Sequence, residues 1–509
     1  MSQPPDDSSQ RKIMDRDPSL PPRDAIAPVE GRVLDPATAI EVKGVKPRPT
    51  IYVGPRLLVS KTVNFEQALQ VFRAVAEPLG WSVEPEEEDP RTARLKFGVR
   101  GVRLGIASNQ ATLAPDAWTL LQQTRDQFGP DAVRGVALDH VVFARPFDSS
   151  HPFDSSHPSG GGHSWPVATY ALPGSGGRQP IAYIGKPPHR TPDKKMTTRR
   201  PVVAILDTGC GKHPWLDNVV EKGVELDSQA IGYTEPNTEP ELHGDLTGEL
   251  DGMIDPLSGH GTFIAGLVRQ ACPDADILSW RVVPPVGPII ESDWIAALAQ
   301  IAELARRFRA DGSGRVIDVL SLSMGYYHET PEDMLFDPTL YEILEDISKG
   351  GTLVVCSAGN DATSRPTFPA AFAPWKDGNG PVQVDPKVLP IVSVGALNPN
   401  GKTDALFSNT GLWVRSYETG AAVMSTFPAF QGGLQPPART KAFGRVREAI
   451  DPDDFRAGFG VWSGTSFAAP LMAGRLARHI QDQLGSGDDP AAAIQRGWDA
   501  VEELTTIKR

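Results

Sequence analysis

The chain has 509 residues, more than one hydrophobic core usually organises, so we expect two or more domains. Hydrophobic residues make up 40% and charged residues 22% of the sequence, as in soluble globular proteins, while 48 prolines and 49 glycines indicate long irregular connections. The formal net charge of −13 argues against a protein that binds nucleic acid or an anionic membrane, because both surfaces would repel the chain.

No segment has the character of a targeting or membrane-spanning sequence. Residues 1–30 lack the apolar run of a signal peptide, and no later window approaches the length that crosses a bilayer. The three cysteines, Cys210, Cys272 and Cys356, are too few for a disulfide framework, which fits a reducing compartment. We therefore expect a cytoplasmic protein in which these cysteines are small buried hydrophobic residues.

The amino-terminal part divides into a tail and a small folded unit. Residues 1–48 are rich in Pro, Asp and Arg without periodicity, which predicts a flexible tail. The next unit, residues 49–145, begins with the strand pattern TIYVGPRLLVS, after which Asn64 is placed to cap a helix. The apolar face of this helix carries Leu69, Phe72, Val75 and Leu79.

The rest of this unit predicts a hairpin, a helix and a final strand. Alternating apolar residues over 93–99 and 102–106 are typical of a half-buried hairpin. A helix over 116–128 is expected to end at Gly129-Pro130, and the segment VRGVALDHVVFA supplies a last strand. Residues 49–145 are therefore predicted to form a small α+β domain.

Residues 146–199 have the composition of a linker. They contain the tandem PFDSSH-PFDSSH, further Gly- and Pro-rich stretches and few core-forming residues. Because the segment holds four of the ten histidines, metal binding has to be weighed; they are His151, His157, His163 and His189. With no cysteine nearby and a flexible backbone, solvated linker histidines are the simpler interpretation.

Residues 200–509 alternate apolar, β-branched runs with helical patterns. Strands are predicted at VVAILD, ADILSWRVV, VIDVLSLSMG, TLVVCSAGN and LPIVSVGAL, with helices over 292–309 and 339–349. Ser292 is the expected amino-terminal cap of the first of these helices. The alternation predicts an α/β domain with a mainly parallel sheet and helices on both faces, preceded by the smaller α+β domain.

Three short segments of this domain place polar side chains at positions that can carry chemistry. VVAILDTG ends an apolar strand in Asp207, SGHGTFIAG sets His260 between glycines, and WSGTSFAAPLMAG sets Ser466 at the start of a helix. Each has an ordinary structural explanation when taken alone: a turn aspartate, a structural or surface histidine and a capping serine. Backbone N–H groups at the start of the serine helix can also face a developing negative charge.

Together, in the chain order Asp, His, Ser, these segments resemble the signature segments of the subtilase family. The resemblance covers about 200–480 and implies that Asp207, His260 and Ser466 are the catalytic triad of a serine endopeptidase. VVCSAGND resembles the family's oxyanion segment, which implies that Asn360 and the backbone N–H of Ser466 bind the oxyanion. One departure is F-A-A after the serine, where the family often has M-A-S or M-A-T.

The resemblance also indicates how a substrate is bound. LSLSMG is similar to the family strand that pairs with an extended substrate, which assigns the substrate backbone to Ser323, Met324 and Gly325. The opposite wall of the primary specificity pocket is expected to comprise Ser357, Ala358 and Gly359.

Two segments add to the family pattern, and no cofactor is implied. The stretch 217–258 is acidic, an insertion lies between Phe427 and Trp462, and both are expected to frame the cleft. The resemblance implies a protein or peptide substrate and no metal in the chemistry. Structural calcium is common in the family, but no compact carboxylate motif places it here.

The role of the amino-terminal domain stays open between two forms of autoinhibition. Many subtilases carry a small α+β propeptide that blocks the cleft, and residues 49–145 have a broadly similar succession of elements. An apparent extra strand and the long linker depart from that pattern. The alternative is a domain that recognises a regulatory partner and restrains the protease until a signal arrives.

Two other functions are compatible with parts of this sequence. A non-proteolytic binding or scaffold protein could retain the fold, but its usual signature, the loss of a catalytic residue, is absent from the sequence. The Ser-Glu-Asp carboxyl peptidases share a G-T-S nucleophile but use glutamate as the base. His260 in H-G-T argues against that class.

Overall fold

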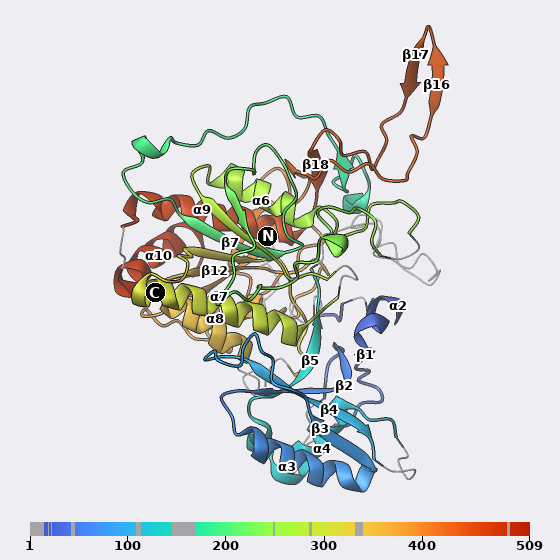
Figure 1. The fold of residues 1–509 in the computed structure, drawn as a ribbon, viewed down its shortest axis with the longest axis vertical. Helices are drawn as coiled ribbons and strands as arrows, with labels where there is room; N and C mark the ends of the chain where they lie inside the picture. The colour runs from blue at the N-terminus through green and yellow to red at the C-terminus, as the bar shows by residue number, and fades with distance from the viewer. Residues whose placement is uncertain are drawn as a thin grey trace, which may run out of the picture.

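The computed structural model describes residues 15–18, 20–21, 23–41, 46–107, 113–144, 169–247, 250–284, 288–330, 339–485 and 489–509. Two bodies are visible within these residues, a smaller one from the amino-terminal part and a larger one that begins near residue 200 (Figure 1). His151, His157 and His163 lie outside the described residues.

The larger body is built on a seven-stranded sheet with the strand order β14–β13–β12–β11–β7–β9–β8. Every strand pair in it is parallel. The strands are β7 (Val202–Asp207), β8 (Val220–Lys222), β9 (Asp276–Arg281), β11 (Val319–Leu322), β12 (Leu353–Ser357), β13 (Ile391–Leu397) and β14 (Ser416–Thr419). The parallel α/β sheet predicted from the apolar runs is confirmed.

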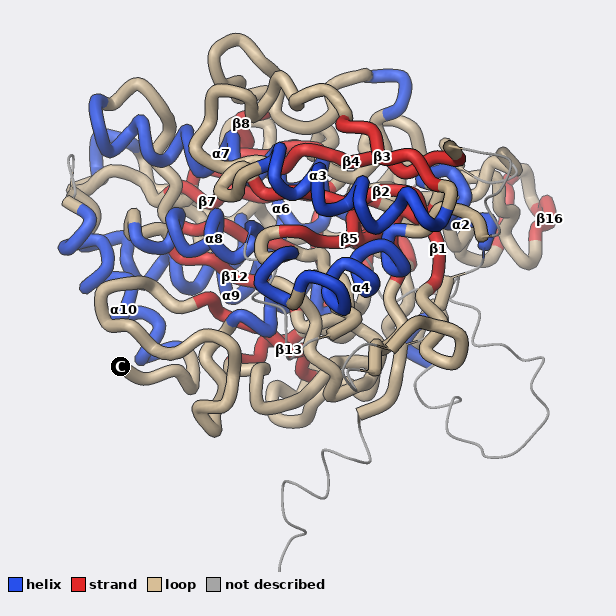
Figure 2. Tube along the Cα trace, turned by 90° about the horizontal axis from the view of Figure 1, so that it is seen from below, coloured by secondary structure: helices blue, strands red, loops and turns tan. Residues whose placement is uncertain are grey.

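Helices cover both faces of this sheet (Figures 1 and 2). One face carries α6 (His260–Ala271), α9 (Thr465–Ile480) and α10 (Pro490–Leu504), and the other carries α7 (Glu291–Asp311) and α8 (Thr339–Lys349). Along β7, Val203 and Ile205 pack beneath α6 and α9, whereas Ala204 and Leu206 pack beneath α7 and α8. Successive strand side chains point to opposite faces, so the continuous apolar run of β7 serves both cores.

The smaller body is an antiparallel sheet covered by two helices. Its strand order is β3–β4–β2–β5–β10, and β1 pairs with β2. The elements are α2 (Arg23–Ile26), β1 (Gly31–Val33), β2 (Ile51–Ser60), α3 (Phe65–Ala76), β3 (Trp81–Pro85), β4 (Val99–Ile106), α4 (Ala117–Phe128), β5 (Val136–Val142) and β10 (Ile289–Ile290). As expected, the Asn64 side chain caps α3 by accepting a hydrogen bond from Gln67 N at 3.1 Å.

The hairpin expected over 93–106 is wrong in its first strand. The strand β4 pairs with β3 on one side and with β2 on the other, and residues 91–97 form turns instead of a strand. The reason lies in packing, because Phe97 is buried in the core shared with α7 and α8, and Leu95 packs against that core. Leu95 and Phe97 therefore face the larger body and do not build the sheet.

The cap of α7 also differs from the expectation. Ser292 lies inside the helix, whose first residue is Glu291. Its backbone N–H and its hydroxyl both donate to Asp139 of β5, each at 3.0 Å. The carboxylate that caps α7 therefore comes from the smaller body, which sequence spacing along the helix could not reveal.

Residues 169–199 lie along the larger body. The strand β6 (Gln179–Pro180) pairs with β18 (Phe459–Trp462), which also pairs with β15 (Val423–Thr426). The Arg178 guanidinium donates to Ile254 O and Asp255 O, both at 2.6 Å. These contacts attach the segment that precedes β7 to two later parts of the chain, the strand β18 and the residues just before α6.

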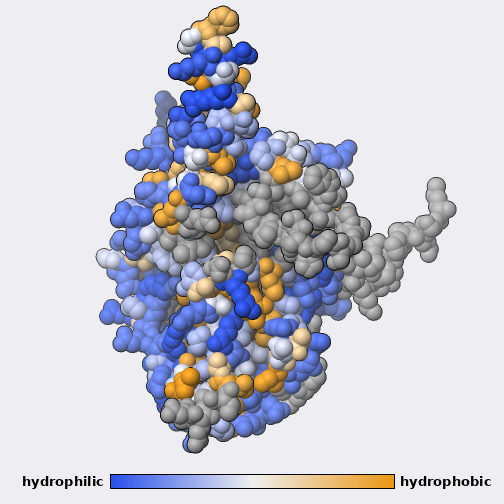
Figure 3. All heavy atoms as spheres, turned by 90° about the vertical axis from the view of Figure 1, so that its right-hand side faces the viewer, coloured by the Kyte–Doolittle hydropathy of each residue, from blue (hydrophilic) through white to orange (hydrophobic). Residues whose placement is uncertain are grey.

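The insertion after Phe427 contains a hairpin that projects from the body (Figure 3). Its strands are β16 (Arg439–Ala442) and β17 (Arg445–Glu448), and Phe443 at its tip is fully exposed. Among the described residues, no helix is long and apolar enough to cross a membrane.

Candidate active site

Asp207 occupies the carboxyl end of β7, in the middle of the parallel sheet. Its side chain is completely buried. Oδ1 accepts hydrogen bonds from Thr208 N at 2.8 Å and from Thr208 Oγ1 at 3.1 Å. The carboxylate is therefore held by the residue that follows it in the D-T-G segment.

His260 is the first residue of α6 and lies directly beside Asp207. Its Nδ1 is 2.7 Å from Asp207 Oδ1, and the ring is completely buried. The preceding Gly259 has φ +86°, and a Cβ there would lie 2.5 Å from the Phe427 ring. Glycine is needed at this position both for the left-handed backbone and for the approach of Phe427.

Ser466 is the second residue of α9 and is only 1% exposed. Its Oγ lies 3.5 Å from Ser323 O, while Ser323 Oγ donates to Ser466 O at 3.0 Å. Within the described part of the chain, Nε2 of His260 is buried and has no hydrogen-bond partner. Catalytic hydrogen bonds are often long in structures without substrate and tighten when it binds.

Asn360 is fixed to the start of the same helix. Its Oδ1 accepts from Thr465 N at 2.8 Å and from Thr465 Oγ1 at 2.9 Å. Thr465 Oγ1 in turn accepts from Gly359 N at 3.0 Å. These bonds orient the Asn360 amide next to the residue that precedes Ser466.

Asn409 fixes the loop that carries Asn360 by bonding the backbone on both sides of it. Its Nδ2 donates to Ala358 O at 2.8 Å, and its Oδ1 accepts from Asp361 N at 3.0 Å. The side chain is completely buried, and a Cβ at Gly359, which has φ +99°, would lie 2.5 Å from its Nδ2. The turn therefore requires glycine at 359 and an amide at 409.

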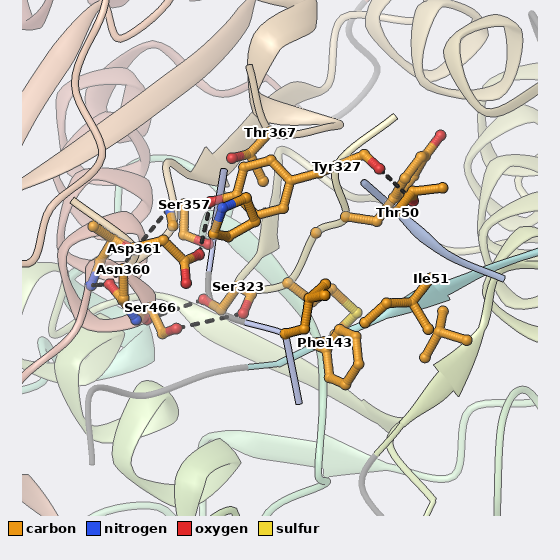
Figure 4. Close-up of a pocket in the computed structure, with 18 of the residues that line it drawn as sticks. Thr50, Ile51, Phe143, Ser323, Tyr327, Ser357, Asn360, Asp361, Thr367 and Ser466 are labelled. Atoms are coloured by element: carbon orange, nitrogen blue, oxygen red, sulfur yellow. Dashed lines mark hydrogen bonds between the residues drawn. The ribbon is translucent and has the colours of Figure 1, made fainter. Parts of the chain in front are cut away.

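A pocket of about 650 Å³ opens beside Ser466 (Figure 4). Its walls include the sequence-predicted binding residues Ser323, Met324, Gly325, Ser357 and Gly359, together with Asn360. Ala358 differs from the expectation, because it is completely buried behind this wall and bonds β13 through its N–H to Val394 O.

The remaining walls of the pocket come from the amino-terminal part of the chain. Thr50, Ile51 and Phe143 line it, and Figure 4 shows Ile51 and Phe143 on the side away from Asn360. Phe143 pairs with Gly325 in antiparallel fashion through two backbone hydrogen bonds of 3.1 Å. The strand expected to bind substrate is thus already paired with the chain's own backbone.

A piece of the predicted tail also reaches this pocket. Pro18 and Leu20 line it, and the Asp17 carboxylate lies 3.1 Å from the guanidinium of Arg365. Arg365 is completely buried, which lowers its pKa to about 10. Asp17 additionally pairs with Arg48 at 2.9 Å.

A buried ionic cluster joins the smaller body to the larger one. His140 of β5 lies with Nδ1 2.6 Å from Glu291 and Nε2 2.8 Å from Glu329, and all three side chains are 2% exposed or less. Burial opposes the charge of the imidazole, but the two carboxylates raise the pKa of His140 well above its usual value. The ring also stacks on Tyr326, with centroids 4.4 Å apart.

Three residues of this region have the ligand types of a metal site. His140, His328 and Glu329 each offer one ligand atom within 4.8 Å of the others. However, both ring nitrogens of His140 already face carboxylates, and Nδ1 of His328 accepts from Thr330 N at 3.1 Å. We therefore interpret the cluster as an ionic hydrogen-bond network.

The three cysteines are buried and free, as expected. Burial raises the pKa of Cys210 to about 12 and that of Cys272 to about 11, so neither thiol is activated.

Sequence reasoning missed several residues that support the site. Thr465 belongs to the G-T-S segment that resembles the family, but its bond to Asn360 and the bond of Asn409 to Asp361 were not foreseen. Glu241, buried beneath Asp207, was treated only as part of an acidic segment. The available signal was a glutamate flanked by the apolar residues Pro240 and Leu242 in an acidic, polar stretch.

The parallel sheet, with Asp207 at a strand end and His260 and Ser466 at helix starts, defines the subtilisin-like fold. The chain belongs to the subtilase family, because the sequence model of that family matches residues 198–495.

Individual relatives are more distant. The chain is 24% identical over 290 residues to the major intracellular serine protease of Bacillus subtilis (strain 168), a match that spans 54% of this chain and 66% of that protein. Fervidolysin from Fervidobacterium pennivorans, a keratinolytic enzyme related to subtilisin, is similar at 15% identity and a TM-score of 0.46, covering 89% of this chain and 57% of that one. A cold-adapted subtilisin-like serine proteinase is similar at 18% identity and a TM-score of 0.36, covering 59% and 82% respectively.

Proposed function

We propose that the protein is a serine endopeptidase that hydrolyses peptide bonds through an acyl-enzyme intermediate. The observation that carries this proposal is the buried 2.7 Å contact between Asp207 and His260 in a subtilase domain whose pocket is lined by Ser466 and Asn360. A catalytically silent scaffold has no need to retain a buried aspartate–histidine pair beside a serine.

In the proposed reaction, Ser466 Oγ attacks the scissile carbonyl while Nε2 of His260 takes its proton. Asp207 holds Nδ1 of the imidazole and stabilises the imidazolium that forms. The Asn360 amide and the backbone N–H of Ser466 bind the oxyanion. His260 then returns the proton to the leaving amine, and water attacks the acyl-enzyme by the same route.

A fluorophosphonate probe tests this assignment, because it reacts with a serine only when a neighbouring base activates it. We expect a single label that maps to the peptide containing Ser466, with heat-denatured protein as the control. Absence of a label after removal of residues 1–199, or a label on another residue, contradicts the proposal. An activity maximum at strongly acidic pH would favour the carboxyl peptidases instead.

We further propose that the amino-terminal region inhibits the protease by occupying its cleft. The pairing of Phe143 with Gly325 takes the place of substrate backbone, and Pro18 and Leu20 form part of the wall of the same pocket. Solvent barely reaches Ser466 and does not reach His260. This arrangement supports inhibition by the chain itself, whether or not residues 1–199 are later removed or a partner protein displaces them.

The backbone pairing predicts a specific response to proline. Phe143→Pro removes the N–H that donates to Gly325 O, whereas Phe143→Ala keeps it. One hydrogen bond contributes about 0.5–1.5 kcal/mol, so the proline variant is expected to react with the fluorophosphonate up to about tenfold faster than the alanine variant. Equal labelling rates would contradict a role for this pairing.

The other assignments follow from the same proposal. The substrates are proteins or peptides, no cofactor takes part in the chemistry, and calcium would have only a structural role. The three buried, free cysteines support a cytoplasmic location.

A further inference from the structure

Glu241 is a buried carboxyl group directly behind the catalytic residues. It lies in the acidic segment 217–258 and is 2% exposed. Its Oε1 accepts a hydrogen bond from Thr208 Oγ1 and one of 3.0 Å from Gly261 N, and its Oε2 accepts from Thr262 Oγ1. A side chain with this many buried donors is not part of a solvated acidic surface.

All three donors are neighbours of the catalytic residues in the chain. Thr208 follows Asp207 and also donates to its Oδ1 from both N–H and hydroxyl. Gly261 and Thr262 follow His260, and Gly261 N lies 2.8 Å from Thr208 Oγ1 as well. The carboxyl group of Glu241 therefore joins the end of β7 to the first turn of α6.

The Thr208 hydroxyl makes this link sensitive to charge. It has one hydrogen but lies within bonding distance of both Glu241 Oε1 and Asp207 Oδ1. When Glu241 is ionised, the Thr208 hydroxyl donates its hydrogen bond to Glu241. The Asp207 carboxylate then accepts hydrogen bonds only from His260 and from the Thr208 N–H. A protonated Glu241 can itself donate to the hydroxyl, which then donates to Asp207 and competes with the imidazole for it.

We propose that Glu241 is a positioning residue, which fixes Asp207 and His260 relative to each other and whose negative charge stabilises the imidazolium of His260 during the reaction. This inference rests on the proposed peptidase function. It adds to the triad a second carboxylate that touches neither substrate nor the histidine ring and acts through Thr208 and Gly261.

The surroundings of Glu241 bring its ionisation into the working range. Burial raises the pKa of Glu241 to about 7, and the nearby Asp207 charge acts in the same direction, against the hydrogen bonds from Thr208, Thr262 and Gly261. The other titratable or charged groups around it are Cys210 after β7, His260 of α6, Glu239 of its own segment and Arg281 of β9. Protonation of Glu241 as the pH falls through about 7 therefore removes its stabilising charge.

The test is the pH dependence of fluorophosphonate labelling of Ser466 in the full chain, for wild type, Glu241→Gln and Glu235→Gln. The control removes one charge from an exposed residue of the same segment. Docking of the amino-terminal region affects all three proteins alike. In the wild type and in the control, we expect the labelling rate to fall at acidic pH through the protonation of two groups, Glu241 and His260.

In Glu241→Gln, only the protonation of His260 should shape the acid limb of the labelling rate. Without the charge that stabilises the imidazolium, we expect this limb about one pH unit lower and the rate at the alkaline plateau about tenfold lower. An acid limb that stays in place in this variant would overturn the proposal and leave Glu241 with a purely structural role. Wild type that does not label at Ser466 even after removal of residues 1–199 refutes the peptidase function itself, so the two failures are distinguishable.

Glu241→Asp provides the second variant in case the glutamine variant does not fold, which thermal unfolding would show. It keeps the charge but shortens the reach to Thr208 and Gly261. We expect its acid limb at the wild-type position and its plateau lowered. A limb displaced to lower pH, or a plateau equal to wild type, would overturn the proposal.

Discussion

Replacement of Ser466 by alanine is expected to lower turnover of a peptide substrate by about 10⁶-fold. In the proposed mechanism alanine removes the atom that forms the acyl-enzyme, while Asp207, His260 and the proposed oxyanion groups stay in place. Because the substitution removes a single oxygen atom and leaves the hydrogen bond from Ser323 Oγ to Ser466 O in place, we expect no loss of folding.

Mass spectrometry of the two purified proteins provides the measurement. Wild type should accumulate cuts between about 146 and 200, and Ser466→Ala should stay intact under the same conditions. Ser463→Ala is a suitable control, since this neighbouring hydroxyl donates to Gly176 O outside the pocket. Equal fragmentation of wild type and Ser466→Ala would show that another nucleophile or a contaminant is responsible.

Replacement of His140 by glutamine is expected to weaken docking of the amino-terminal domain at least 100-fold. The variant leaves the carboxylates of Glu291 and Glu329 buried without the imidazolium between them. Removal of one partner from a buried ion pair typically costs about 3–5 kcal/mol. Hydrogen exchange of the β5 amides, measured in the Ser466→Ala background to prevent self-cleavage, reports the opening of this interface.

Docking through His140 should also depend on pH. The pKa of His140 is raised in the docked state, so its contribution is complete below the ordinary histidine pKa of about 6.5 and is lost as the pH rises through the raised value. In that range docking weakens about tenfold per pH unit. His328 stays neutral there, because burial lowers its pKa to about 4.

The matched control is His479→Gln, whose imidazole is partly exposed and 3.9 Å from Glu503. It should leave both the protection of β5 and its pH dependence unchanged. A His140→Gln protein that protects β5 as wild type does at every pH would contradict the role of the cluster.

The sheet and the residues at its edge were accessible to sequence reasoning because their signals are local. A strand such as VVAILD is buried on both faces, so its sequence is a continuous apolar run, and the polar residue that ends the run lies at the candidate site. One sequence pattern therefore predicts both the strand and the site residue. The proposed triad was recognisable from the order of three glycine-flanked segments, and in the structure His260 Nδ1 lies 2.7 Å from Asp207 Oδ1.

Features that depend on distant segments were not accessible in this way. Asp139 caps α7 although it lies 153 residues before Ser292 in the chain. Phe97 is buried against helices that follow it by some 200 positions. Contacts between such distant segments produce no periodic pattern in the sequence. Glu241 belongs to an irregular, acidic stretch, where its burial arises only after β7 and α6 have come together. The short strands β8 and β14 contain polar residues and carry little strand signal of their own.

The position of β5 has a consequence for the fate of the amino-terminal domain. In the intact chain β5 is hydrogen-bonded to β2 on one side, while its other edge meets β10, and Phe143 just beyond it meets Gly325. All seven of its residues are buried. Detachment from the protease would leave this apolar strand as a bare sheet edge, the kind of surface that pairs with other chains and aggregates. A released amino-terminal domain is therefore expected to be short-lived, and under the proposed autoinhibition its loss would make activation difficult to reverse.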